Sequence, residues 1–401
     1  MPKFDSNKAE TIQNTNSATE NVNSNNNQNT AKSNQVKQKL PFTLPVLDAL
    51  LYDEGFAESL KNDAQINDEE LDKLRKLTGE AVAALGENEM KSGSTRNAER
   101  NAENKIRQMF GDEKADKIFE LVTSRWNAGE LNPETALNNK PNSIPADTRI
   151  VVNAPAYRMD VFQDGNLVKT YKIGIGYPEF PLPNGLRKAD TIIFNPTWTP
   201  PDEPWVKGKF KPYKKVEAGS KLNPLGLIKI PIGLPSLIHG GKQKERLGNF
   251  ASHGCVGLTN DQVEDFSLIL SQVSGTELDK SQVLEFLKER GKTKNVELAK
   301  TIPVELRYET IVVENGILII YRDVYERGTN NEENLRKVFE VYGLNFDQLE
   351  AGLKQNILKS IMEMNKDADG KPISETTENI ENEKNNESSK VTKNIKGQKE
   401  I

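Results

Sequence analysis

The chain has 401 residues, a formal net charge of −5 and a pI near 5.5, which argues against a nucleic-acid binder because such proteins normally display a basic face. An apolar content of 35% and a mean hydropathy of −0.67 indicate that part of the chain lies outside any packed core. The sequence has no long uninterrupted apolar run and no apolar stretch at its start. We therefore expect no transmembrane segment and see no secretory signal.

Both ends of the sequence are strongly polar. The first forty residues contain ten asparagines and almost no large apolar residues. Residues 366–401 are similarly rich in Glu, Asn, Lys and Ser. Such compositions cannot bury enough apolar surface to offset the entropy of folding, so residues 1–40 and 366–401 are predicted to be disordered.

Residues 41–145 have the pattern of a helical region. Apolar residues recur at helical intervals from Pro45 to Tyr52, and Asn67 precedes an acidic first turn, as a helix cap does. A third helix is predicted from about Asn97 to Trp126. Gly111 is expected to divide it, because glycine is unfavourable inside a helix.

The middle of the sequence has the pattern of β structure. Val, Ile, Tyr and Phe alternate with polar residues on both sides of Asp164-Gly165, which predicts a hairpin, and Pro and Gly punctuate residues 173–236 as short strands and loops require. Thr259 and Gln262 have the spacing of a capping box, and Val263 and Phe266 begin a helical apolar stripe after it. The fold class is therefore predicted to be α+β, with a mainly β central domain.

The chemically reactive side chains of this chain are concentrated in one place. The sequence contains one cysteine and two histidines, and all three fall within the seventeen residues from His239 to Cys255. A thiol is a good nucleophile only as thiolate, and an imidazole is the usual group that lowers its pKa or takes its proton. The window therefore predicts acyl transfer by a thiol.

The tight element from Ser252 to Cys255 suits an oxyanion hole, because Gly254 lets consecutive N–H groups turn toward one developing negative charge. A zinc site is the alternative. Structural zinc normally needs four protein ligands, and the sequence has no second cysteine or third histidine to supply them. We expect no metal, and one cysteine cannot form a disulfide within the chain.

The same residues resemble a known family. Ile238-His239-Gly240, followed after a loop by Ser252-His253-Gly254-Cys255-Val256, is similar to the signature of YkuD-type L,D-transpeptidases, which cross-link or edit bacterial peptidoglycan. Four further segments resemble parts of that domain. Residues 149–176 resemble its opening hairpin, 195–201 a segment between the first strands and the active site, and 303–308 and 323–325 the closing strands of some members. The resemblance covers roughly residues 146–330, and it implies a β-sandwich or barrel-like catalytic domain that uses no cofactor.

The resemblance also implies roles for the window. Cys255 would be the nucleophile that attacks a peptidoglycan stem peptide, and His239 would be the general acid and base. The carbonyl of Gly240 would orient the His239 ring. His253 would position the thiol and, with Gly254, contribute to the oxyanion hole.

Four residues are candidates for contacts with the substrate, and each has a second explanation or a weaker signal than the catalytic residues. Lys242 and Arg246 are candidates to bind the carboxylates of stem peptides, although charge that keeps a loop soluble explains them equally well. Ser252 and Trp198 are further candidates, and Trp198 could instead only pack its own loop. Gly257 departs from the family, in which arginine or asparagine often stands two places after the cysteine. A contact made there is expected to be missing or supplied elsewhere.

The remaining expectations concern organisation. The predicted parts are a polar leader at 1–40, a helical region at 41–145, the YkuD-like catalytic domain at 146–330, helices within 331–365 (331–342 and 346–364), and a polar tail at 366–401. The helical region could contact the cell wall or another protein, or could simply pack against the enzyme. A hydrolase with the same Cys255–His239 pair, and a wall-binding or zinc-stabilised module without turnover, remain alternatives. The inferred substrate predicts the periplasm or cell envelope, in conflict with the absence of a visible signal.

Overall fold

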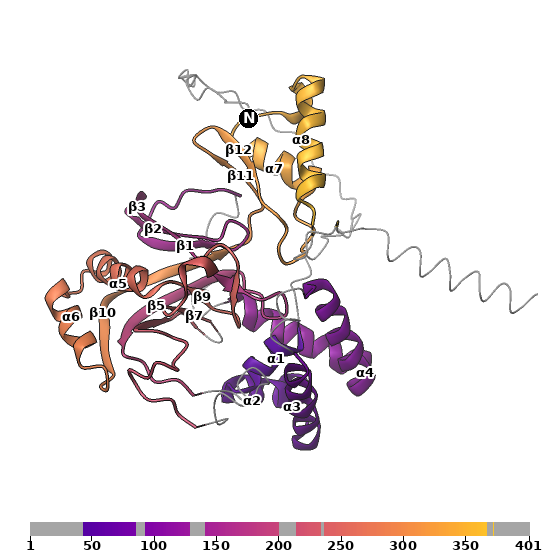
Figure 1. Ribbon diagram of the computed structural model, residues 1–401. Helices are drawn as coiled ribbons and strands as arrows, with labels where there is room; N and C mark the ends of the chain where they lie inside the picture. The colour runs from indigo at the N-terminus through magenta and orange to yellow at the C-terminus, as the bar shows by residue number, and fades with distance from the viewer. Residues whose placement is uncertain are drawn as a thin grey trace, which may run out of the picture.

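The computed structural model describes residues 43–85, 93–128, 141–199, 214–233, 236–366 and 372. The larger hydrophobic cores lie in the N-terminal helices, around a central sheet, and in a C-terminal group of elements. Figure 1 shows the sheet with the two end groups at different sides of it. The two segments predicted to be disordered, 1–40 and 366–401, lie outside the described residues except for Lys366 and Pro372.

Four helices precede the sheet: α1 (Leu44–Leu51), α2 (Glu54–Asp63), α3 (Asp68–Ala83) and α4 (Thr95–Ala128). The predicted cap is confirmed, because the Asn67 and Glu70 side chains form a capping box at the start of α3. Gly111 has a φ of 76° and a ψ of 170°, so it breaks α4 as the sequence predicts. No helix within the described ranges combines the length and apolar character needed to cross a bilayer.

The central sheet has eight strands in the order β3-β2-β1-β10-β5-β6-β7-β9. Their bounds are β1 (Arg149–Asn153), β2 (Arg158–Gln163), β3 (Asn166–Lys172), β5 (Gly185–Phe194), β6 (Ile228–Pro231), β7 (Leu237–His239), β9 (Val256–Gly257) and β10 (Lys294–Arg307). A small parallel sheet pairs β4 (Ile175–Gly176) with β8 (Phe250–Ser252). The hairpin predicted at Asp164-Gly165 connects β2 to β3, with both turn residues at positive φ.

The longest strand, β10, lies inside the sheet although it comes last in the sequence. It pairs in parallel with β1 and antiparallel with β5. Helix α5 (Asn260–Ser274) begins at the predicted capping box of Thr259 and Gln262 and packs its buried side chains against the sheet, and α6 (Lys280–Lys288) follows it. These elements confirm the predicted α+β class.

The C-terminal group consists of a hairpin and helices with their own core. Strands β11 (Ile311–Glu314) and β12 (Ile317–Ile320) pack with α7 (Glu332–Val341), the 3₁₀ turn η4 (Phe346–Gln348) and α8 (Ala351–Met364). The two predicted C-terminal helices are therefore confirmed. The predicted boundary between residues 330 and 331 falls inside this group, because the hairpin shares its core with α7 and α8.

The expectation of a closing strand at 323–325 is wrong, because Asp323 holds this segment in a turn. Its carboxylate accepts the Tyr308 hydroxyl at 2.6 Å and the backbone N–H groups of Arg327, Gly328 and Thr329 at 2.9, 2.6 and 3.2 Å. A carboxylate that collects several backbone donors fixes a loop and leaves no extended ladder.

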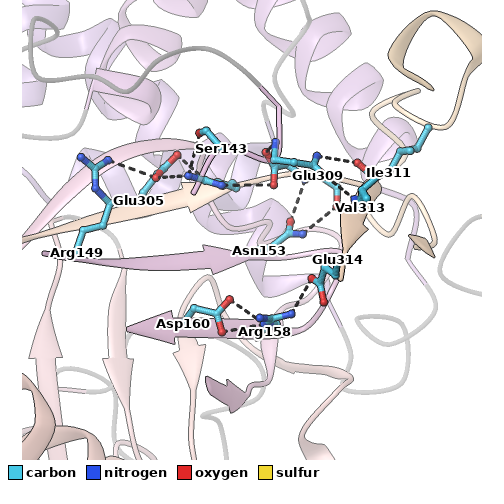
Figure 2. A network of polar contacts seen from close by, with 12 residues as sticks. Ser143, Arg149, Asn153, Arg158, Asp160, Glu305, Glu309, Ile311, Val313 and Glu314 are labelled. Atoms are coloured by element: carbon cyan, nitrogen blue, oxygen red, sulfur yellow. Dashed lines mark hydrogen bonds and ion pairs between the residues drawn. The ribbon is translucent and has the colours of Figure 1, made fainter. Parts of the chain in front are cut away.

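Polar side chains join the sheet to the C-terminal group (Figure 2). Arg158 on β2 contacts Asp160 at 2.8 Å and Glu314 on β11 at 2.7 Å. Glu309 accepts the backbone N–H of Asn142 at 2.7 Å. These contacts link β11 to β2 and the segment after β10 to Asn142, so they hold the C-terminal group against the sheet.

Candidate active site

The candidate site lies at the β7–β9 edge of the sheet. The two strands run in parallel, with Ile238 opposite Val256 and His239 opposite Gly257. Cys255 stands in the bend immediately before β9, and Lys242 and Lys229 influence both its thiol and the His239 ring. The sheet therefore brings together a thiol and an imidazole that the sequence separates by a loop.

His239 is held in one orientation inside the protein. Its side chain is buried, and Nδ1 lies 2.7 Å from the carbonyl oxygen of Gly240. A carbonyl can only accept, so this contact favours a proton on Nδ1. A second contact of the ring, with the Leu225 backbone, also stabilises the protonated form. Burial, reinforced by the charge of Lys242, lowers the pKa of His239 to about 3.

The Cys255 thiol is subject to opposing influences. Burial raises its pKa, whereas the N–H of Leu237 and the positive charges of Lys242 and Lys229 lower it. Neither lysine has an ion pair within the described residues, so their charges are not neutralised locally. Thiolate formation at this position therefore depends on nearby cations and on a base that accepts the proton.

Cys255 follows a tight turn. The Ser252 hydroxyl donates to the Cys255 carbonyl at 2.5 Å and accepts the Cys255 N–H at 3.1 Å. Gly254 has a φ of 86°, which side chains rarely allow, and its carbonyl accepts the Ser236 hydroxyl at 2.8 Å. The Cys255 N–H is thus engaged by Ser252, while in the described part of the chain the Gly254 N–H meets no acceptor.

His253 lies in an aromatic setting. Its ring is edge-on to Tyr177 at 5.3 Å and to Phe180 at 4.8 Å between centroids. Burial, with a further contribution from Lys242, lowers the pKa of His253 to about 3. Arg246 donates to the Tyr177 hydroxyl at 2.9 Å, so this arginine braces the ring that packs on His253.

The N-terminal helices hold the loop that carries Tyr177 and Phe180. The Thr95 hydroxyl, at the start of α4, donates to the Pro178 carbonyl at 2.7 Å, and the Thr43 hydroxyl donates to the Glu179 carbonyl at 2.7 Å. Val82 at the end of α3 shares a small core with Tyr177 and Phe180. The helical region therefore packs directly behind the wall of the site.

The C-terminal side holds the same loop from another direction. The Tyr325 hydroxyl donates to the Gly176 carbonyl at 2.9 Å, and Arg327 donates to the Leu182 carbonyl at 3.0 Å. Arg327 also lies over the Tyr308 ring, 4.1 Å from its centroid. The loop is consequently fixed by segments on both sides of it in the sequence.

Lys242 is fixed through the loop that follows β7. Its N–H donates to the Leu258 carbonyl at 3.0 Å, and the Gly241 N–H before it donates to the Asn260 side chain at 3.0 Å. Its side chain passes over Gly257: a Cβ built there would lie 2.8 Å from Cγ and 2.9 Å from Cε of the lysine. The space beside Gly257, where the family departure was noted, is thus filled by Lys242.

The structure places the other predicted residues as follows. The Ser252 hydroxyl forms both of its hydrogen bonds with backbone atoms of Cys255, inside the turn. Trp198 lies after β5, where its backbone pairs with Val216. Sequence reasoning missed Lys229, whose signal was a lysine inside an otherwise apolar strand, and missed Tyr177 and Phe180, for which no local signal exists. Among the described residues, no group of three or more His, Cys, Asp or Glu side chains could hold a metal ion.

Comparison with known families agrees with this geometry. Residues 147–274 match the sequence model of YkuD, described as the L,D-transpeptidase catalytic domain. This part of the chain is similar to YkuD catalytic domains. The match includes β7, β9 and the turn between them, and it ends before β10.

Proteins named as L,D-transpeptidases are similar over the same part. YqjB of Bacillus subtilis is 26% identical over 152 residues, which are 36% of this chain and 73% of that protein. YbiS of Escherichia coli is 32% identical over 137 residues, or 32% of this chain. The alignment spans 45% of YbiS, so less than half the length of that relative is matched.

Solved structures were also matched at lower similarity. The catalytic domain of the Enterococcus faecium L,D-transpeptidase is 17% identical, and the match covers 41% of this chain and all of that one, with a TM-score of 0.27. An L,D-transpeptidase from Mycobacterium smegmatis is 15% identical over 40% of this chain and 59% of its own, with a TM-score of 0.25.

Proposed function

We propose that the protein is a cysteine L,D-transpeptidase that acts on peptidoglycan stem peptides. The observation that carries the proposal is the pairing across β7 and β9, which puts the buried His239 imidazole opposite Gly257, two residues after Cys255. The similarity to YkuD catalytic domains supplies the substrate class. Burial keeps the His239 ring neutral at neutral pH, and its pKa of about 3 makes it a weak base in the resting site. The proposal therefore requires that the pKa of His239 rises as a thiolate forms beside it, because an adjacent negative charge favours the protonated ring.

The proposed reaction has two halves. Cys255 Sγ attacks the carbonyl of the peptide bond between diaminopimelate and D-alanine, and His239 Nε2 accepts the thiol proton. The C–N bond then breaks, His239 returns the proton to the nitrogen of D-alanine, and the stem remains as a thioester. An amine of a second stem then attacks the thioester, its proton passes to the thiolate, and a 3–3 cross-link forms. Positioned proton transfer of this kind contributes roughly 10²–10⁴-fold.

In this proposal, backbone N–H groups of the turn before Cys255 stabilise the negative charge that develops on the carbonyl oxygen of the substrate. The Cys255 N–H already serves Ser252, so we assign the oxyanion contact first to the Gly254 N–H. His253 positions the thiol from the aromatic pocket of Tyr177 and Phe180. Lys242 and Arg246 bind the carboxylates of the stem peptides, and Ser252 acts through the turn that it closes.

Location and partners follow from the proposed substrate. Peptidoglycan lies outside the cytoplasmic membrane, so we place the enzyme in the periplasm or cell envelope. Of the two roles considered for residues 41–145, the contacts of Thr43, Thr95 and Val82 with the wall of the site favour packing against the enzyme. No cofactor is required by the proposed steps.

The test is mass spectrometry of the full chain incubated with disaccharide tetrapeptides. We expect a cross-linked dimer and a thioester on Cys255, loss of both in Cys255→Ala, and strong loss of product in His239→Gln. Gln243→Ala, in the exposed part of the same loop, is the matched control and should keep wild-type turnover.

Tripeptide without dimer would replace the transferase by the hydrolase that uses the same Cys255–His239 pair. A tight equivalent of zinc that shields Cys255 from alkylation, with no product, would replace it by the non-catalytic module. Cross-linking that survives Cys255→Ala would refute the mechanism outright.

A further inference from the structure

Three neighbouring strands place one row of residues on the face of the site. Lys229 on β6 is opposite His239 on β7, and His239 is opposite Gly257 on β9. Directly paired residues in a sheet point to the same face. The row therefore presents a lysine, the histidine and then a position with no side chain.

The Lys242 side chain occupies the place left by Gly257. An alanine Cβ at 257 would lie 2.8 Å from Cγ and 2.9 Å from Cε of Lys242, closer than Cβ atoms normally approach carbon. Cγ is not the free end of the side chain, so the lysine would have to leave this path. Gly257 is thus a geometric condition for the position of Lys242.

This path lies beside the thiol. Cys255 is two residues before Gly257, in the bend that leads into β9, and its thiol is within the influence of the Lys242 charge. The backbone of Lys242 is pinned by its hydrogen bond to Leu258, and the Asn260 side chain pins Gly241 before it. These contacts fix the point from which the Lys242 side chain starts, and from there it extends over the strand that follows Cys255.

We propose that Lys242 sets the reactivity of the Cys255 thiol by stabilising its thiolate, and that Gly257 is the residue that admits it. This inference rests on the proposed role of Cys255 as nucleophile. Lys242 is assigned as a positioning residue that acts through Cys255, which is a different role from binding substrate carboxylates.

The groups around the thiol explain why the lysines matter. Lys242 from the loop after β7 and Lys229 from β6 act on the thiol and on the His239 ring, Lys242 acts on the His253 ring as well, and Arg246 acts on Lys242 in turn. Both imidazoles are neutral at pH 7, because burial lowers each pKa to about 3. The lysines are therefore the nearby cations, and Lys242 affects the thiol more than Lys229 does.

The Lys242 side chain loses its charge within the pH range that an alkylation experiment can cover. Burial lowers its pKa to about 8, with the Cys255 thiolate opposing this shift and Arg246 adding to it. The ammonium is thus largely present at pH 7 and is lost as the pH rises past about 8. Its support of the thiolate falls away over the same interval.

The experiment measures the rate of alkylation of Cys255 by iodoacetamide between pH 5 and 10, on the full chain, by intact mass. Because a nearby opposite charge shifts a pKa by roughly one to three units, Lys242→Met is expected to remove at least about one pKa unit of thiolate stabilisation below pH 8, where the lysine is charged, and the two profiles should converge above that pH. Alkylation at pH 7 should slow about tenfold. Lys242→Arg should keep most of the wild-type profile, since it keeps the charge.

Gly257→Ala supplies the independent arm, because it displaces Lys242 without changing its charge. It should move the profile in the same direction, and the double variant Gly257→Ala/Lys242→Met should be no slower than Lys242→Met alone. The matched control is Lys244→Met, which removes a charge from an exposed position of the same loop and should leave the profile unchanged. Circular dichroism verifies that each variant is folded.

A folded Lys242→Met variant with the wild-type profile would overturn the inference, as would an equal shift in Lys244→Met. If Lys242→Met does not fold, Gly257→Ala decides by the same criterion. The outcome is separable from the proposed function: a wild-type thiol that shows the Lys242-dependent profile but forms no thioester with tetrapeptide would refute the transpeptidase and leave this inference standing.

Discussion

The contact between helix α4 and the site wall can be tested with Thr95→Val. Thr95 is fully buried, and its hydroxyl donates to the Pro178 carbonyl at 2.7 Å. Valine has nearly the same shape, so the substitution removes the donor with little change in packing. A buried acceptor that loses its partner costs about 1–3 kcal/mol, and we expect the free energy of unfolding to fall by that amount.

Two measurements check this prediction. Urea titration gives the change in the free energy of unfolding, and hydrogen exchange followed by mass spectrometry gives the local opening of residues 176–184. We expect faster exchange in that loop, because Thr95 and Thr43 hold it from the helical side. Thr170→Val is the control: its hydroxyl bonds to Asp160 on an exposed strand, and its loss should change stability by no more than about 0.5 kcal/mol.

The reasoning would be refuted by a specific pattern. If Thr95→Val unfolds at the same urea concentration as the wild type and residues 176–184 exchange at the same rate, the hydroxyl does not hold the loop. If stability falls equally in Thr170→Val, the loss belongs to threonine in general and not to this contact.

Two further predictions concern histidine titration and glycine packing. Because the pKa of His239 is about 3 in the folded protein and about 6.5 when unfolded, the unfolded state binds the extra proton between these values, so stability should fall as the pH drops from about 6.5 toward 3, by up to about 1.4 kcal/mol per pH unit. His253 has the same lowered pKa and adds a similar slope, so His239→Gln should remove about half of the combined slope in denaturant titrations at several pH values, and an unchanged slope would contradict the assignment. Gly79 lies in α3 with open space around it, so Gly79→Ala should raise the free energy of unfolding by about 0.5–1 kcal/mol. Gly176→Ala should lower the free energy of unfolding sharply, because the new Cβ would overlap the Phe180 carbonyl oxygen. Thermal melts that rank the two variants in the opposite order would contradict this packing.

The reactive centre was predictable because its signals are local in the sequence. Three scarce side chains fall within one window, and the cap residues Asn67 and Thr259 mark helix starts by their spacing to the next polar residue. The strand at 303–308 was also foreseen, but nothing local says that it lies between β1 and β5, since strand order depends on pairing between distant segments.

The surroundings of the site could not be foreseen for the same reason. Tyr177 and Phe180 meet His253 only because β4 pairs with β8, and Lys242 reaches its place only because Gly257 belongs to the neighbouring strand. Asp323 was misassigned to a strand because neighbouring Val324 and Tyr325 favour β structure, whereas the donors that fix its turn are contributed in part by Tyr308, fifteen residues away.

The position of β10 has a consequence for how the chain is made. Synthesis proceeds from the N-terminus, so β1–β3 and β5–β9 emerge long before residues 294–307 can join them. Until then each half of the sheet presents an unpaired inner edge, the kind of surface that pairs with other chains. The helices of residues 43–128, complete much earlier, can shelter the second half of the nascent sheet during this delay through the contact of α4 with β5. A fragment that stops at residue 274, where the family match ends, would keep Cys255 and His239 and yet leave both edges permanently open.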